Sequence, residues 1–325
     1  MTRFNGSILG SPRGSSVLSA SGVWSVNNVG IARLSDAWPI ISTGPTNGYT
    51  SGGFSPPSVN TIDKFSFSAD GNATYVGDLT VSRSAAAGQS STVSGYTSGG
   101  SPPLVNTIDK FPFSSNANAT DVGDLTVSRG NIAGQSSDSS GYTSGGSAPA
   151  VVNTIDKFPF FSNTNATDVG DLTQVRNSAT GQSSSSSGYS AGGIVPPFVN
   201  TIDKFPFAAD ANATDVGDLS QTRGAPAGQS SSTSGYTSGG GNPGIVNTID
   251  KFPFATDANA TDVGDLTVTN YRMAGQSSSS SGYSSGGDGP AFRDIIDKFP
   301  FSSDGNASDV GDLTQAKRFP AGQQG

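Results

Sequence analysis

The stretch GYTSGGSPPLVNTIDKFPF, residues 95–113, contains two short strand-like segments that are separated by a turn. Gly-Gly and Pro-Pro, which favour turns, lie between the two segments. Nearly the same sequence occurs at residues 48–67, 141–160, 188–207, 235–254 and 282–301. Six copies of one segment indicate a repeat architecture, which has to be recognised before any secondary structure is assigned.

The repeats keep a nearly constant period. Their Gly-Tyr pairs begin at residues 48, 95, 141, 188, 235 and 282, so one repeat follows another every 46 or 47 residues. The I-D-K-F, Gly-Asp-Leu and Gly-Gln motifs return with the same period, and a single deletion falls between Gly100 and Asn106. The repeat region therefore covers residues 48–325, and residues 1–47 form a separate N-terminal segment.

Each repeat holds four short strand-like segments, of the types A-G-Q-S-S, G-Y-T-S-G-G, N-T-I-D-K-F and A-T-D-V-G-D-L. Turn residues separate them, and no segment keeps a helical period of apolar residues. Four strands in a repeat of roughly 45 residues are typical of a propeller blade. The sequence therefore predicts an all-β fold, a six-bladed β-propeller over residues 48–325.

The array begins with a second strand, at Tyr49, and ends just after a first strand, AGQQG at residues 321–325. An open stack of blades would leave an unpaired edge, so we expect Ala321–Gln324 to complete the first blade and close the ring. Two alternatives remain. Residues Ile40–Gly44 could fill the same position, or the terminal strand could pair with another subunit and build a filament.

The composition excludes several classes of function. The chain has a net charge of −8, and only 13% of its residues are charged, which argues against a nucleic-acid partner. It has no cysteine and no histidine, so thiolate chemistry and a Ser-His-Asp triad are excluded. No apolar run is long enough to span a membrane. We expect no enzymatic activity and no cofactor.

The loops after strands two and four should lie on one face of the disc, and these loops differ between repeats. The opposite face repeats Ser-rich turns and Asn-Ala-Thr hairpins. Aromatic residues beside Arg and Lys suit stacking on a sugar or binding an acidic group, so the variable face is a candidate ligand-binding surface. Alternatively, the variation marks loops under no constraint. The unusual residues of this face are Asn270, Tyr271, Arg272, Met273, Phe292, Arg293, Lys317, Arg318 and Phe319.

Acidic residues also recur in fixed places. Asp121 and Asp124 belong to a repeated D-x-x-D, and D-A-N-A-T-D at residues 210–215 is similar to an oxygen-rich calcium loop. The Gly and the distal Glu of such a loop are missing, so we favour a hairpin turn and predict no metal site. We expect adjacent Asp and Lys residues, such as Asp63 and Lys64, to form ion pairs between blades.

Two resemblances add to this interpretation. The segment Tyr96-Thr97-Ser98-Gly99-Gly100, with an aromatic residue before a double glycine, resembles the second strand of a kelch-like propeller blade. The Arg residues that follow the fourth strands also fit this family, whereas Val-Gly-Asp-Leu stands where the family has Trp. The resemblance implies the blade layout. The Arg residues concerned are Arg83, Arg129, Arg176 and Arg223.

Residues 15–39, SSVLSASGVWSVNNVGIARLSDAWP, resemble a segment of structural and tail-fibre proteins of tailed phages, and the repeat array is similar to arrays in such proteins. The resemblance implies a protein of the extracellular virion that is assembled in the host cytoplasm. Residues 1–47, with Trp24 and Trp38, would then be an arm that attaches to other virion proteins or to further copies of the chain, or a strap packed on the propeller.

These observations lead to one expected function and one alternative. The expected function is a tail-fibre or receptor-binding component that displays a rigid propeller for adhesion to a glycan or receptor of the host surface. The alternative is an architectural subunit without a ligand, such as a head decoration, a fibre knob or a filament protomer. In both cases we expect a homo-oligomer.

Overall fold

The computed structural model describes residues 7–9, 23–25 and 44–325. The chain divides into two units, Met1–Gly44 and Pro45–Gly325. In the first unit β1 (Ser7–Leu9) pairs antiparallel with β2 (Val23–Ser25), and Trp24 stands opposite Ile8. Trp38 lies outside the described residues. In the described ranges the structure has no helix long and apolar enough to cross a membrane.

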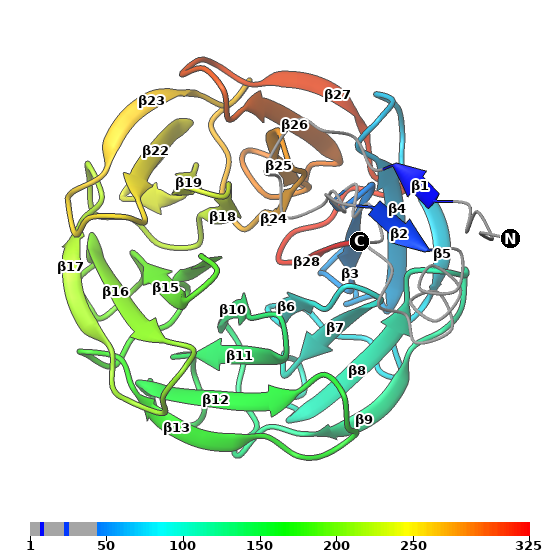
Figure 1. Ribbon diagram of the computed structural model, residues 1–325. Coiled ribbons are helices and arrows are strands. Elements are labelled where there is room, and N and C mark those ends of the chain that lie inside the picture. The colour runs from blue at the N-terminus through cyan, green and yellow to red at the C-terminus, as the bar shows by residue number, and fades with distance from the viewer. Residues whose placement is uncertain (1–6, 10–22, 26–43) are drawn as a thin grey trace, which may run out of the picture. The chain divides into compact units, whose positions relative to one another are not determined.

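The second unit is a ring of six four-stranded antiparallel sheets, as Figure 1 shows. The prediction of a six-bladed β-propeller is therefore confirmed. In chain order from blade one, the innermost strands are β28 (Ala321–Gln324), β6 (Ala87–Ser90), β10 (Ala133–Ser136), β14 (Thr180–Ser183), β18 (Ala227–Ser230) and β24 (Ala274–Ser277). The second strands are β3 (Asn47–Ser51), β7 (Ser94–Ser98), β11 (Ser140–Ser144), β15 (Ser187–Ala191), β19 (Ser234–Ser238) and β25 (Ser281–Ser285).

The outer half of each blade consists of the I-D-K-F strand and the Gly-Asp strand. The third strands are β4 (Thr61–Ser66), β8 (Thr107–Pro112), β12 (Thr154–Pro159), β16 (Thr201–Pro206), β22 (Thr248–Pro253) and β26 (Ile295–Pro300). The fourth strands are β5 (Thr74–Asp78), β9 (Thr120–Asp124), β13 (Thr167–Asp171), β17 (Thr214–Asp218), β23 (Thr261–Asp265) and β27 (Ser308–Asp312). Blade five also has a small hairpin of β20 (Gly241–Asn242) and β21 (Gly244–Ile245) in the loop after its second strand.

The C-terminal strand closes the ring. Strand β28 pairs with β3, so that Ala321 stands opposite Ser51 and Gln324 opposite Gly48. In Figure 1 the two ends of the colour scale meet in this blade. The expectation that Ala321–Gln324 complete blade one is confirmed. The position considered for Ile40–Gly44 is occupied, and the edge that would build a filament is paired within the chain.

The Gly-Gln motif of each inner strand is explained by the narrow space around the axis. A Cβ atom at Gly322 would collide with the carbonyl oxygen of Gly275, and a Cβ atom at Gly88 would collide with that of Gly322. Only glycine allows the neighbouring backbones to approach this closely. The same relation links Gly134, Gly181, Gly228 and Gly275 to the preceding inner strands.

The glutamine of the motif joins each blade to the next. Gln323 Nε2 donates to the Tyr96 carbonyl oxygen at 3.0 Å and to Ser51 Oγ at 2.8 Å, and its side chain is fully buried. Five further glutamines make the same bond to a Tyr carbonyl, so the bonds run once around the ring. These glutamines are Gln89, Gln135, Gln182, Gln229 and Gln276.

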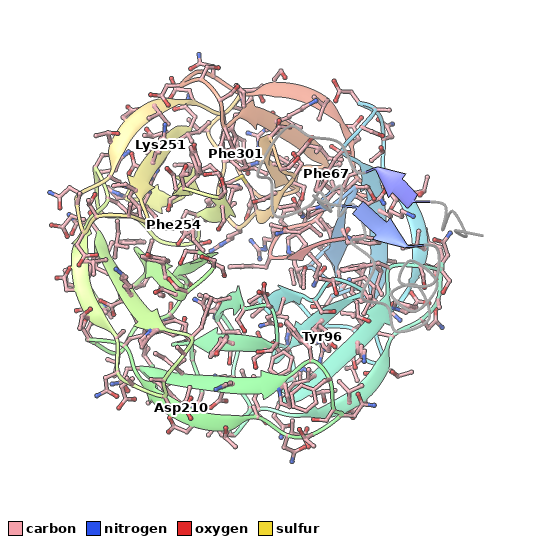
Figure 2. The ribbon with its side chains drawn as sticks, viewed as in Figure 1. Phe67, Tyr96, Asp210, Lys251, Phe254 and Phe301 are labelled. Atoms are coloured by element: carbon pink, nitrogen blue, oxygen red, sulfur yellow. The ribbon has the colours of Figure 1, made fainter. Side chains whose placement is uncertain are left out.

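Aromatic side chains fill the outer part of each seam between blades. Tyr189 of blade four stacks on Phe254 of blade five at 4.9 Å and tilts against Phe252 at 5.4 Å between ring centroids. Figure 2 labels three phenylalanines of this type, Phe67, Phe254 and Phe301, each of which stacks on a tyrosine of the preceding blade. These clusters supply most of the apolar core, because the strands themselves are rich in Ser, Thr and Gly.

Asp and Lys of the I-D-K-F motif form inter-blade ion pairs in most blades, but not with each other. In five blades the Asp pairs with a buried cation of the preceding blade, and in four blades the Lys pairs with an Asp of the following blade. Asp63 is buried and pairs with Lys317 of blade six at 3.1 Å. Lys298, the counterpart of Lys64, reaches Asp70 of blade one at 2.8 Å near the surface. Adjacent residues of a strand point to opposite faces, so they cannot share one partner. Four buried pairs resemble that of Asp63: Arg83–Asp109, Arg129–Asp156, Arg176–Asp203 and Arg223–Asp250.

The acidic and asparagine-rich hairpins are structural elements. Asp121 Oδ1 accepts a hydrogen bond from the amide of Gly123 at 3.1 Å, a local turn contact. Asn118 Oδ1 accepts from the amide of Asp78 in the neighbouring blade at 3.0 Å, and every Asn of the Asn-Ala-Thr/Ser sequences has this type of contact. These contacts agree with the hairpin interpretation.

The glycine at the closing seam gives a first prediction. Gly322→Ala should destabilise the protein by about 1–3 kcal/mol, because the added methyl group must displace the backbone of Gly275. Gly71→Ala is the matched control, since a Cβ atom there meets nothing within 4 Å. Urea unfolding measures both variants. Equal stabilities of the two would contradict closure by close approach of the inner strands.

Candidate functional site

One end of the axial opening is surrounded by six residues with positive φ, which follow the fourth strands of the six blades. Their backbones are joined by hydrogen bonds that run from blade to blade, for example from Phe319 N to Arg272 O at 2.7 Å and from Ala85 N to Phe319 O at 3.0 Å. The opening has a volume of about 110 Å³. The six residues are Ala85, Asn131, Ser178, Ala225, Arg272 and Phe319.

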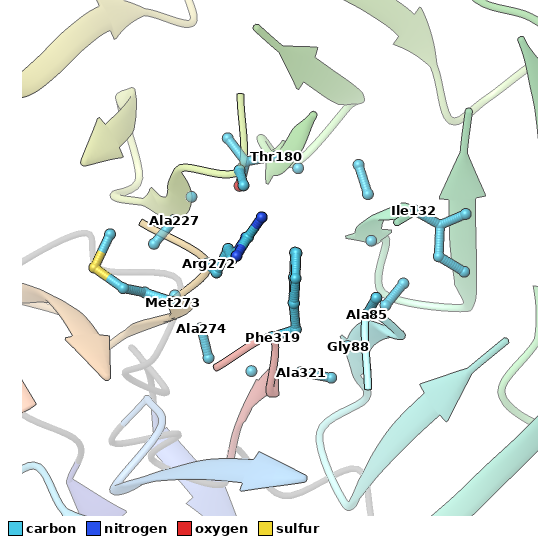
Figure 3. Close-up of a pocket in the computed structure, with 18 of the residues that line it drawn as sticks. Ala85, Gly88, Ile132, Thr180, Ala227, Arg272, Met273, Ala274, Phe319 and Ala321 are labelled. Atoms are coloured by element: carbon cyan, nitrogen blue, oxygen red, sulfur yellow. The ribbon is translucent and has the colours of Figure 1, made fainter. Parts of the chain in front are cut away.

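Two of these six positions carry large side chains. Arg272 has φ +63° and Phe319 has φ +55°, a region in which residues other than glycine are uncommon and which costs about 1–3 kcal/mol. Figure 3 shows both side chains reaching into the opening. The Arg272 guanidinium carbon lies 4.8 Å from the Phe319 ring centroid and 4.4 Å from that of Tyr271. Large residues at strained positions support the hypothesis of a functional site.

Asp288, in the loop after the second strand of blade six, joins two arginines. Its Oδ2 lies 3.0 Å from Arg272 Nη1 and 2.8 Å from Arg318 Nη1. Burial by itself would raise the pKa of Asp288, but the hydrogen bonds from Arg318 and Arg272 lower it below its ordinary value. The carboxylate therefore stays ionised, and it holds the two guanidinium groups on either side of it.

The second arginine packs against a pair of aromatic rings that contact each other, with 5.9 Å between their centroids. The guanidinium carbon of Arg318 lies 5.0 Å from the ring centroids of both Phe54 and Phe292. The side chains of Arg272 and Arg318 are 28% and 29% exposed, so both remain accessible. Two cations share one carboxylate, which leaves a surplus positive charge at this place in a chain with net charge −8. We call Tyr271, Arg272, Asp288, Arg318, Phe319, Phe54 and Phe292 the Arg–aromatic cluster.

Asn270 organises the loops of the cluster. It occupies the position that Arg83, Arg129, Arg176 and Arg223 hold in the first four blades. Its Oδ1 accepts from the amides of Tyr271 at 3.0 Å and Asp288 at 2.9 Å, and its Nδ2 donates to Gly286 O at 2.9 Å. The repeated seam cation has thus been replaced by an amide that fixes the backbone from Gly286 to Asp288.

The replacement leaves Asp297 without the buried ion pair that its counterparts have. Asp297 accepts hydrogen bonds from Thr267 Oγ1 at 2.7 Å and from the Thr267 amide at 3.1 Å. Burial raises the pKa of this carboxyl above its ordinary value, because the hydrogen bonds from Thr267 and the charge of Arg293 only partly offset the loss of water. Among the described residues, the seam between blades five and six is thus the one whose third-strand aspartate has no buried ion pair.

The structure brings together five of the residues that the sequence indicated on this face: Tyr271, Arg272, Phe292, Arg318 and Phe319. Arg293 lies beside the cluster, and its Nη2 donates to Thr269 O at 3.4 Å.

Met273 and Lys317 are placed differently. Met273 is buried in the core of blades five and six with Tyr236 and Leu266. Lys317 is fully buried, and burial lowers its pKa, although it still pairs with Asp63 at 3.1 Å. Lys317 occupies in blade six the position that Arg83 occupies in blade one. It is the buried cation of its seam, as Arg83 is of the next. We therefore remove both residues from the candidate binding surface.

Two residues of the cluster were missed at the level of sequence. Phe54 and Asp288 both follow the double glycine of their blade, where the other blades have Ser101, Ser147, Ile194 and Gly241. In those four blades the residue is small or aliphatic. The aromatic ring of Phe54 and the charge of Asp288 were therefore the signal in the sequence. Phe54 joins the cluster because its backbone bridges that of Arg318 across the closing seam.

The arrangement has the chemistry to bind an anionic ligand. It offers guanidinium donors with surplus positive charge beside aromatic rings, a combination that recognises an anionic group attached to a ring. Among the described residues no cluster of three or more His, Cys, Asp or Glu side chains could hold a metal ion. No protein-family model matches this chain, and no curated protein matches it.

The seam between blades five and six gives a second prediction. Asp297→Asn should change the free energy of unfolding at neutral pH by less than about 1 kcal/mol, or raise it, because no cation loses its partner. Asp203→Asn, the matched control, should cost about 3–5 kcal/mol, because it leaves Arg176 buried and unpaired.

The pH dependence has a definite sign. The folded-state pKa of Asp297 is raised, so the native state binds the proton more tightly and stability falls as pH rises from the ordinary value through the raised one. Asp297→Asn should remove this loss of stability. Urea unfolding at a series of pH values between about pH 4 and pH 8 measures it. An unchanged pH profile would count against a raised pKa of Asp297.

Proposed function

We propose that this protein is a virion component of a tailed phage that attaches to a glycan of the host surface through the Arg–aromatic cluster. The similarity of residues 15–39 and of the repeat array to phage structural proteins supports the virion setting. The ring supports a role in display, because its bonds run from each blade to the next and hold the loops on a rigid frame.

The local loss of symmetry is the observation that carries the proposal. The inner glycines, the seam glutamines and the tyrosine–phenylalanine contacts recur in all six blades. On the variable face, in contrast, large aromatic and charged residues gather where blades five, six and one meet. Such a cluster adds nothing that the other seams need for folding, so a ligand is the simplest reason for it.

The chemistry of the cluster points to a sugar with an anionic group. Aromatic rings stack on the C–H face of a sugar, and a guanidinium group binds a carboxylate or phosphate through charge-assisted hydrogen bonds. Asp288 holds both arginines in place before a ligand arrives, which reduces the entropy lost on binding.

A glycan array with the whole protein tests the proposal. Arg272→Gln combined with Arg318→Gln should weaken binding to acidic glycans by at least about tenfold, since two charge-assisted contacts are lost. Lys64→Gln combined with Lys110→Gln is the charge-matched control, because both lysines lie over tyrosine rings away from the cluster. Absence of glycan binding, or equal loss in both double variants, would contradict adhesion through the cluster.

Asn270→Arg separates binding from folding in the same assay. The substitution restores the repeated seam cation opposite Asp297 but removes the amide that holds Tyr271 and Asp288. We expect it to preserve or raise the melting temperature while it weakens glycan binding. Undiminished binding in this variant would show that the position of the Asp288 loop does not matter for the ligand.

The second candidate function is an architectural subunit. It is favoured by the division of the chain into two units, Met1–Gly44 and Pro45–Gly325, of which the second forms the ring. Deletion of residues 1–44, which spares the bonds from Thr46 and Asn47 to Gly325, should leave a folded ring that no longer enters particles. Particles that form normally without glycan binding by any variant would support this candidate over adhesion.

A further inference from the structure

A second hollow lies on the same face as the axial opening, at the seam between blades four and five, and has a volume of about 310 Å³. Ile194 and Phe198 of the blade-four loop form one wall, and Gly241, Pro243 and Ile245 of the β20–β21 hairpin form another. This hairpin belongs to blade five, whereas the corresponding loops of other blades hold isolated bridges such as the one between Ile194 and Phe198. The hollow is thus a local feature and not a consequence of the repeat.

The remaining wall comes from the Arg–aromatic cluster. Tyr271, Arg272 and Phe319 all line the hollow, and Arg272 is its one charged lining residue among the described residues. A single cation in a mostly apolar wall is the arrangement expected for a small ligand that is oriented by one polar contact. The positive φ of Arg272 places its side chain between the axial opening and the hollow.

The charge of Arg272 is only partly compensated. Asp288 meets one of its nitrogen atoms, Nη1, and shares the same carboxylate oxygen with Arg318. A guanidinium group carries five N–H donors, so donors remain for a second anion. Asp288 does not line the hollow, and no carboxylate does among the described residues, so a ligand carboxylate would meet no repulsion from its walls.

We propose that the hollow binds one six-membered sugar acid, with its carboxylate on Arg272 and the C–H face of its ring against Ile194, Phe198 and Ile245. The volume lies at the lower end of the range of about 300–1,000 Å³ for ligand sites, which suits one ring and not an extended oligosaccharide. The proposal rests on the proposed function, and it locates the recognised group at the seam of blades four and five.

Calorimetric titration of the whole protein with monosaccharides tests this assignment. The probes are glucuronate and N-acetylneuraminate at millimolar concentration, with glucose and N-acetylglucosamine as neutral counterparts. We expect binding of at least one acid and of neither neutral sugar. Arg272→Gln should weaken that binding by at least about tenfold, whereas Arg318→Gln, outside the hollow, should have a smaller effect.

Two variants fill the hollow without a change of charge. At Gly241 a Cβ atom meets only Gly244 O at 3.6 Å and Tyr271 Cδ2 at 3.8 Å, so Gly241→Leu should be accommodated and should abolish binding. Ile245→Trp fills the hollow from a second position of the same loop and serves if the first variant does not fold. Circular dichroism and thermal melting establish folding of each variant.

The outcomes separate the hollow from the proposed function. Glycan-array binding that survives Gly241→Leu and Ile245→Trp would overturn the hollow and leave adhesion by the cluster intact. Binding of sugar acids in the hollow by a protein that recognises no glycan on the array would support the hollow and overturn adhesion. If neither sugar acid binds, whether or not benzoate binds in their place, the assignment to a sugar acid is overturned.

Discussion

The close approach of the six inner strands is the constraint on which the whole ring depends. Glycines 88, 134, 181, 228, 275 and 322 leave no room for a side chain, and each following glutamine reaches a carbonyl group of the next blade. Because these contacts return to their starting point through β28, no blade can shift without breaking the contacts of its neighbours. The loops at the ends of the strands are consequently held at fixed distances from the axis, which allows residues from three blades to build one cluster.

The seam of blades five and six departs from the repeat. The departure removes one buried ion pair and fixes the loop that carries Asp288. Five seams bury a cation beside the aspartate of the third strand, whereas the seam of blades five and six has Asn270. Asp297 then loses its counter-charge, and Asp288 gains a fixed backbone between two arginines. A repeat protein can accept this exchange because the other seams keep the ring closed.

The sequence predicted the fold well because the period carries the information. Counting from Gly-Tyr to Gly-Tyr gave the number of blades, and the missing first strand of blade one predicted closure by Ala321–Gln324. The site was predicted only in part. Lys317 and Met273 stand in variable segments of the sequence, but their side chains turn into the seams. Asp288 and Phe54 belong to the cluster because they contact residues of other blades. A sequence pattern does not reveal contacts between residues so far apart in the chain.

The strained positions at the axial opening are the main support for the proposed binding surface over the architectural alternative. All six blades need a left-handed residue there, since the backbone hydrogen bonds between blades require it. Alanine, serine and asparagine meet this need at four positions with little bulk. Arginine and phenylalanine at the other two meet it no better for the ring, and they bring a charge and an aromatic surface into the opening. A disc that served only as a spacer would gain nothing from them, so their presence favours recognition of a ligand.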